Sequence, residues 1–113
     1  MSDCLFCKII KKEIPSTFVY ENENVYAFRD IHPQAKQHIL VVPKKHITSI
    51  METDTSSQTL KQVCDAIKEI AKQERIDLSG FRITINNGPD AGQTVFHLHF
   101  HLLGGERLSD KMA

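Results

Sequence analysis

The chain has 113 residues, of which 41% are hydrophobic and 25% are charged, and its 14 basic residues balance its 14 acidic ones. This length predicts a single domain over residues 1–113 with one hydrophobic core. The neutral charge balance gives no reason to expect binding to nucleic acid or to an anionic membrane. No apolar run approaches the roughly 18 residues of a membrane span. The start of the chain is polar and lacks a signal-peptide core, so we expect a cytoplasmic protein.

The first part of the chain predicts a short helix followed by three strands. Apolar residues at helical spacing favour a helix over residues 5–12, and a proline soon ends it. Residues 17–21 and 25–30 are rich in strand-forming side chains and flank a polar turn, which is typical of a hairpin. Residues 38–42 form a nearly continuous apolar run, which predicts a central strand that ends at Pro43.

The second part predicts one long helix and two more strands. Thr55 and Gln58 have the spacing of a capping box at the start of the helix. An apolar stripe at helical spacing follows and predicts a buried face. Its members are Leu60, Val63, Cys64, Ile67, Ile70 and Ala71. We therefore expect Cys64 in the core. Residues 81–86 alternate as a strand does, and the loop 87–94 leads to a last strand. The predicted fold class is α+β, with a five-stranded antiparallel sheet, one long helix and a short N-terminal helix.

Three of the six histidines fall at alternate positions of one stretch, residues 95–104. Because side chains alternate across a strand, His97, His99 and His101 would share one face, about 6.5–7 Å apart. The residues between them are apolar and would face a core. An isolated histidine usually packs in a core or on a surface, but this row of three predicts chemistry.

The residues alone leave two chemistries open for this row. Three imidazoles and a water molecule can hold a catalytic zinc ion. Neutral imidazole is also a nucleophile towards phosphorus, and a reference pKa of about 6.5 leaves most of it neutral at pH 7. The preceding loop favours a phosphate, since Gly88 and Gly92 would let backbone N–H groups approach an anion. Side-chain donors of Asn86, Gln93 and Thr94 lie nearby in the sequence.

The row matches the motif His-φ-His-φ-His-φ-φ, in which φ is apolar, of the histidine triad (HIT) superfamily of nucleotide hydrolases and transferases. Residues 30–35, 38–47 and 86–105 resemble its histidine triad nucleotide-binding branch, and the similarity extends from Cys4 to Gly105. The resemblance implies a purine nucleoside phosphoramidase-like hydrolase. Its substrates would be purine nucleotides or nucleoside phosphoramidates.

The resemblance also implies residue roles. His99 would attack the α-phosphorus, and water would release a nucleoside monophosphate from the nucleotidyl-histidine. His101 would bind the phosphate oxygens and help to protonate the leaving group. Asp30 would hold the ribose, and His38 would have a supporting role near the site. The implied phosphate contacts are Asn86, Gly92, Gln93 and Thr94. The implied base slot consists of Phe6, Ile9, Phe28, Ile31 and Leu40.

Cys4 and Cys7 form a Cys-x-x-Cys pair near the start of the chain. From the local sequence, they could be ordinary thiols beside a helix, a redox pair without the usual βαβ context, or two of four zinc ligands. In some relatives such a pair joins histidines equivalent to His46 and His97. The resemblance therefore implies one structural Zn²⁺ held by these four residues, with no open position for water.

The resemblance further implies a homodimer, in which the long helix and a strand edge join two sheets into one ten-stranded sheet. The tail, residues 106–113, has no tryptophan, whereas better-known relatives carry an aromatic-containing tail that shapes leaving-group specificity. The preference for a leaving group therefore does not carry over. His32 has no counterpart in the motif and is expected at the surface.

Two alternatives to this hydrolase remain. The first is a metalloenzyme in which all three triad histidines bind one catalytic metal ion. The second is a nucleotide-binding regulatory or scaffold protein with incidental catalysis, because a binding site and an active site would use the same residues.

Overall fold

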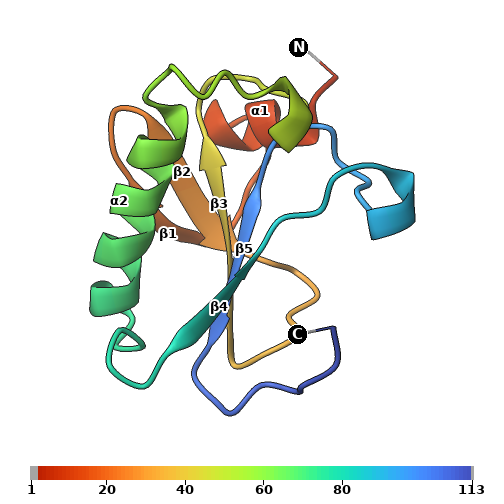
Figure 1. Cartoon of the computed structure of the whole chain (residues 1–113). Coiled ribbons are helices and arrows are strands. Elements are labelled where there is room, and N and C mark those ends of the chain that lie inside the picture. The colour runs from red at the N-terminus through yellow and green to blue at the C-terminus, as the bar shows by residue number, and fades with distance from the viewer. Residues whose placement is uncertain (1–2, 113) are drawn as a thin grey trace.

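The computed structural model describes residues 3–112 and contains two α-helices and one five-stranded sheet (Figure 1). The elements in chain order are α1 (Leu5–Ile10), β1 (Phe18–Glu21), β2 (Val25–Arg29), β3 (Gln37–Pro43), α2 (Thr59–Gln73), β4 (Phe81–Thr84) and β5 (Phe100–Gly104), with short 3₁₀ turns at Ile50–Glu52 and Pro89–Ala91. The strand order is β1-β2-β3-β5-β4, and every neighbouring pair is antiparallel. The predicted α+β class, the five strands, the long helix and the short N-terminal helix are confirmed. Within residues 3–112, no helix is long and apolar enough to cross a membrane.

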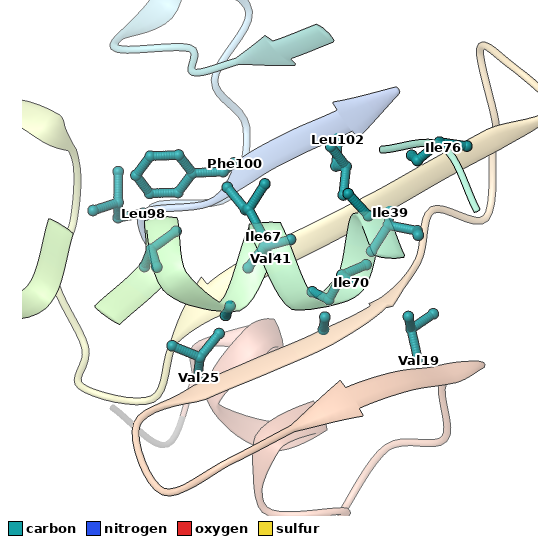
Figure 2. Packing of buried hydrophobic residues seen from close by; sticks show 14 residues of the cluster. Val19, Val25, Ile39, Val41, Ile67, Ile70, Ile76, Leu98, Phe100 and Leu102 are labelled. Carbon is teal, nitrogen blue, oxygen red and sulfur yellow. The ribbon is translucent and has the colours of Figure 1, made fainter. Parts of the chain in front are cut away.

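The main core lies between α2 and one face of the sheet (Figure 2). The buried side of α2 includes Ile67 and Ile70, which pack in the same cluster as Val41 of β3. The apolar residues that alternate with the histidines all belong to this core: Leu98, Phe100 and Leu102. The predicted alternation along the histidine stretch is therefore confirmed, and the histidines project from the opposite face.

A second, smaller cluster covers part of that opposite face. Phe6 and Ile9 of α1 pack against side chains of β2 and of the central strand, β3. The members from these strands are Tyr26, Phe28, Leu40 and Val42. Because α1 has only six residues, it covers one end of this face, beside the triad histidines.

The start of α2 differs from the predicted capping box. The helix begins at Thr59, whose backbone N–H donates to Ser57 Oγ at 3.4 Å, and Gln58 makes no side-chain capping bond. The Thr55–Gln58 prediction was wrong because Asp54 accepts a hydrogen bond at 2.9 Å from the backbone N–H two residues later. This turn keeps the segment before Thr59 out of the helix.

The prediction that Cys64 is a core residue was also wrong, because its side chain is exposed. The buried face of α2 runs through Val63, Ala66, Ile67 and Ile70. Cys64 lies about 100° around the helix from Val63, just outside that face.

The last two strands are shorter than predicted. β4 ends at Thr84 instead of residue 86, and β5 begins at Phe100 instead of residue 95. The backbone N–H of Leu98 donates to the Ile47 carbonyl at 2.6 Å, so the segment before β5 follows the loop after β3 and leaves the sheet. Two of the three triad histidines therefore lie just before the strand.

Candidate functional site

The sheet face opposite α2 presents side chains in rows that run across the strands. In one row, Leu40 of β3 lies opposite His101 of β5, and His101 lies opposite Thr84 of β4. In the adjacent row, His38 of β3 lies opposite Leu103 of β5. Cross-strand partners share a face and lie in side-chain contact. His38 and His101 are therefore diagonal neighbours across β3 and β5, although 63 positions separate them in the sequence.

The proton of the His99 ring is fixed by a backbone carbonyl. Nδ1 of His99 lies 2.7 Å from the carbonyl oxygen of His97. A carbonyl only accepts, so Nδ1 carries the proton, and the neutral ring keeps a lone pair on Nε2. The ring of Phe6 packs edge-on against His99, with the ring centroids 5.0 Å apart. Burial lowers the pKa of His99, against the opposing effects of the His97 carbonyl and the Asp30 charge.

His101 lies beside His99, and their ring centroids are 5.1 Å apart. Its Nδ1 lies 2.9 Å from Nε2 of His38. Its Nε2 is buried and has no hydrogen-bond partner within residues 3–112. Burial, followed by the nearby His99 and His38, lowers the pKa of His101 to about 4. The ring is therefore neutral near pH 7.

Asp30 is the first residue after β2, and its carboxylate contacts both His38 and the backbone of the loop that follows. Its Oδ1 accepts a hydrogen bond from the backbone N–H of His32 at 2.8 Å, and its Oδ2 lies 3.4 Å from His38 Nε2. Burial lowers the pKa of His38, and the Asp30 carboxylate opposes that shift. The side chain of His32 is exposed, as its lack of a motif counterpart predicted.

A second group of donors forms where α1 meets the ends of two loops. Cys4 caps the N-terminus of α1, Cys7 lies in its first turn, His46 follows β3, and His97 precedes β5. Cys4 Sγ and Cys7 Sγ lie 3.4 and 3.6 Å from Nδ1 of His97, and Cys7 Sγ lies 3.3 Å from Nδ1 of His46. All four donor atoms lie within 4.8 Å of one another.

This donor group fits a tetrahedral metal ion. Typical zinc–sulfur and zinc–nitrogen bonds place the two kinds of donor about 3.6 Å apart in a tetrahedron. His97 is fully buried, and its Nε2 lies 2.8 Å from the Pro43 carbonyl oxygen, to which it donates. The lone pair of the neutral ring is therefore on Nδ1, the atom that faces the two sulfurs.

The same geometry separates the three triad histidines. Among residues 3–112, two groups of donor atoms are close enough to hold a metal ion. His97 belongs to the first group with the cysteines, and His101 belongs to the second with Asp30 and His38. His99 belongs to neither group. This arrangement does not favour one catalytic metal bound by all three triad histidines.

The expected base-slot residues divide into two sets. Four of them are buried together in the smaller cluster beneath α1: Phe6, Ile9, Phe28 and Leu40. Ile31 is instead 85% exposed, directly after Asp30 in the chain. A ligand lying against Ile31 would cover an apolar side chain that this structure leaves in solvent.

The loop before the histidines is braced by Gln93, which is only 5% exposed. Its Oε1 accepts a hydrogen bond from the Gly88 N–H at 2.9 Å, and its Nε2 donates to the carbonyls of Thr48 and Val95 at 2.8 and 3.2 Å. Gly88 and Gly92 have φ angles of 84° and 82°, which glycine adopts readily. The Gln93 amide thus shapes the loop that carries the exposed Thr94.

Sequence reasoning missed the backbone groups of this site. The carbonyls of Pro43 and His97 fix the tautomers of His97 and His99. The backbone N–H of Gln34 donates to Nδ1 of His38 at 3.0 Å. Every residue except proline carries both backbone groups, so no residue type signals these contacts. They become visible only when the loops and the strand register are known.

Comparison with known proteins places this geometry in context. A family model described as the HIT domain matches residues 11–108. The 14 kDa zinc-binding protein of Zea mays is 47% identical over 111 residues, which are 96% of this chain and 86% of that protein. The purine nucleoside phosphoramidase of Escherichia coli is 41% identical over 112 residues, 98% of this chain and 94% of that enzyme. The crystal structure of a HIT family hydrolase from Legionella pneumophila superposes with a TM-score of 0.91 at 44% identity, and covers 96% of this chain and 98% of that one.

Proposed function

Because the chain belongs to the HIT domain family, we propose that it is a hydrolase of nucleoside phosphoramidates and related purine nucleotide derivatives. The observation that carries the proposal is the position of the proton on the His99 ring, which is on Nδ1 and not on Nε2. Its Nδ1–H is held by the His97 carbonyl at 2.7 Å, so its Nε2 presents a lone pair on the sheet face opposite α2. A neutral imidazole held in one tautomer is suited to attack phosphorus.

In the proposed first step, the lone pair on Nε2 of His99 forms a bond to the α-phosphorus. The phosphorus–nitrogen bond of the substrate breaks, its electron pair stays on the nitrogen, and the amine leaves with a proton taken from solvent. The ring becomes cationic as its electron pair is used. The His97 carbonyl already accepts the Nδ1–H bond, so it stabilises that charge without rearrangement.

In the second step, water attacks the same phosphorus, the bond to Nε2 breaks, and the attacking water releases one proton to solvent, which balances the proton taken up by the amine. The products are a nucleoside monophosphate and a His99 ring with its lone pair restored. We assign His101 to the phosphate oxygens and to the leaving group, because its buried Nε2 lacks a partner within residues 3–112 and the ring lies next to His99. Two displacements replace one difficult displacement, which is the gain from covalent catalysis.

The rest of the nucleotide would lie along the same face. Asp30 would accept two hydrogen bonds from the ribose hydroxyls, and the apolar cluster under α1 would contact the base. His38 would support the phosphate end of the site. The residues proposed to surround the phosphate are Asn86, Gly92, Gln93 and Thr94. In this proposal the Gln93 side chain acts by bracing the loop.

Replacement of His99 tests the nucleophile. We expect His99→Ala to lower the release of nucleoside monophosphate from adenosine 5′-phosphoramidate by at least about 10³-fold, because no other group replaces Nε2. The matched control is His32→Ala, which removes an exposed histidine and should retain the parent rate. Equal rates for His99→Ala and the parent would reject the mechanism. Nucleotide binding by a parent that shows no turnover would favour the regulatory alternative.

The two cysteines and two histidines beside α1 are proposed to hold one structural zinc ion. The ligands are Cys4, Cys7, His46 and His97, whose donor atoms have the spacing described above. With four protein ligands, the ion has no open position and serves to hold the fold. It would tie α1 and the loop after β3 to the segment that carries His97, two residues before His99.

Metal analysis tests this site. The protein purified with reduced thiols and without chelators should contain one zinc ion per chain. We expect Cys7→Ser to lose the ion and to unfold at a lower temperature, because a tetrahedral site loses a thiolate ligand. Cys64→Ser is the matched control, since Cys64 is exposed on α2 and belongs to neither group of close donor atoms. A parent without zinc, or equal zinc loss in both variants, would contradict the assignment.

The free edge of the sheet supports a homodimer. β4 is an outer strand, and its cross-strand register places Ile83 opposite Leu102, on the face that α2 covers elsewhere. Phe81, Ile83 and Ile85 are nevertheless 37–43% exposed. An apolar outer strand with unpaired backbone groups is a template for a second copy. We propose that two β4 edges pair and join the sheets into one of ten strands.

Light scattering in solution tests the dimer. We expect the parent to have twice the mass of the chain, and Ile83→Asp to have the mass of one chain, because a carboxylate would be buried between the two copies. Leu78→Asp is the control, since Leu78 is 96% exposed just before β4 and should leave the mass unchanged. A parent of one chain, or an Ile83→Asp variant that stays paired, would contradict the proposed interface.

A further inference from the structure

We propose that His38 is a positioning residue that sets which nitrogen of His101 carries the proton, through a hydrogen-bond chain that starts at the backbone N–H of Gln34. The chain consists of two contacts, Gln34 N to His38 Nδ1 at 3.0 Å and His38 Nε2 to His101 Nδ1 at 2.9 Å. The consequence for catalysis rests on the proposed hydrolase function, but the proton arrangement itself does not.

The first contact fixes the tautomer of His38. A backbone N–H can only donate, so Nδ1 of His38 accepts and carries no proton. The proton of the neutral ring is therefore on Nε2. The loop that supplies this N–H is itself held in place: the Asp30 N–H donates to the His38 carbonyl at 3.0 Å, and the Gln34 side chain donates to the His32 carbonyl at 3.0 Å.

The second contact fixes the tautomer of His101. Two acceptors face the Nε2–H of His38, namely His101 Nδ1 at 2.9 Å and Asp30 Oδ2 at 3.4 Å. The shorter contact has ordinary hydrogen-bond length, and the longer one is outside it. His38 is 5% exposed, so bulk water competes little for the proton. With Nδ1 accepting, the neutral His101 carries its proton on Nε2.

The end of the chain is the buried Nε2 of His101, which has no partner within residues 3–112. A buried N–H without an acceptor is costly, so this position calls for an acceptor from a ligand. His99 and His101 thus present opposite properties from adjacent rings, a lone pair on one Nε2 and an N–H on the other. In the other tautomer, His101 would present a lone pair that repels phosphate oxygens.

The rival explanation of this cluster is a metal site, because donor atoms of Asp30, His38 and His101 lie within 4.8 Å of one another. A metal ion there would need the lone pair of His38 Nε2. That nitrogen must carry the proton while Nδ1 accepts from Gln34. His97 shows the opposite pattern, with its proton directed away from the donor group to a carbonyl. The cluster is therefore arranged as a hydrogen-bond chain.

The test compares two variants of nearly equal size and shape, His38→Gln and His38→Glu. An amide can donate to His101 Nδ1 as the imidazole does, whereas a carboxylate can only accept. In the full-length, zinc-loaded protein at mildly alkaline pH, nitrogen NMR of the histidine rings reports which ring nitrogen is protonated. We expect a protonated Nε2 and a bare Nδ1 on His101 in the parent and in H38Q, and a protonated Nδ1 in H38E.

Turnover of adenosine 5′-phosphoramidate gives the second readout. We expect the rate of H38E to fall at least about 10-fold below that of H38Q, because His101 would lose the N–H that it presents to the phosphate oxygens. A merely structural role for His38 would not make the His101 proton follow the choice between amide and carboxylate. If either variant loses the dispersed spectrum of the folded protein, the pair His38→Asn and His38→Asp replaces it with the same contrast.

Three results would overturn the inference: a protonated Nδ1 on His101 in the parent, the same tautomer in H38Q and H38E, or a second zinc ion in the parent that H38Q loses. Failure of the proposed function looks different. A parent that shows the expected tautomer but no turnover would reject the hydrolase and support the chain from Gln34 to His101.

Discussion

The antiparallel register of β3 against β5 is the constraint on which the candidate site depends. It places Leu40 opposite His101, and His38 opposite Leu103. Because side chains alternate with a period of two, a slip of β5 by one residue would turn His101 into the core and bring Leu102 to the open face. The apolar residues under α2 resist such a slip, since Leu102 is fully buried there. The packing of the core thus holds the histidines in position.

Backbone groups then give chemically identical side chains different properties. The Pro43 carbonyl accepts the Nε2–H of His97, which leaves the lone pair of that ring on Nδ1, facing two sulfurs. The His97 carbonyl accepts the Nδ1–H of His99, which leaves the lone pair of that ring on Nε2. These bonds are available because the segment before β5 leaves the ladder, which frees a carbonyl there from pairing with a neighbouring strand. The departure of β5 from regular strand geometry is therefore part of the site.

The pattern of residues predicts much of this arrangement. Strict alternation placed the histidines on one face, and the helical stripe located α2. The errors arose where local signals compete: Asp54 closes a turn where Thr55 suggested a cap, and Cys64 lies just beyond the buried face. The tautomers could not be predicted, because they depend on backbone groups that tertiary structure brings to each ring.

The proposed bond between His99 Nε2 and phosphorus is most directly tested by the stereochemical course of hydrolysis. The substrate is a nucleoside phosphoramidate made chiral at phosphorus by one sulfur atom, and the solvent is water labelled with heavy oxygen. Each in-line displacement inverts phosphorus, so attack by His99 followed by attack by water predicts net retention of configuration. Net inversion would show that water displaces the amine in one step, and would contradict the role of His99 as the nucleophile.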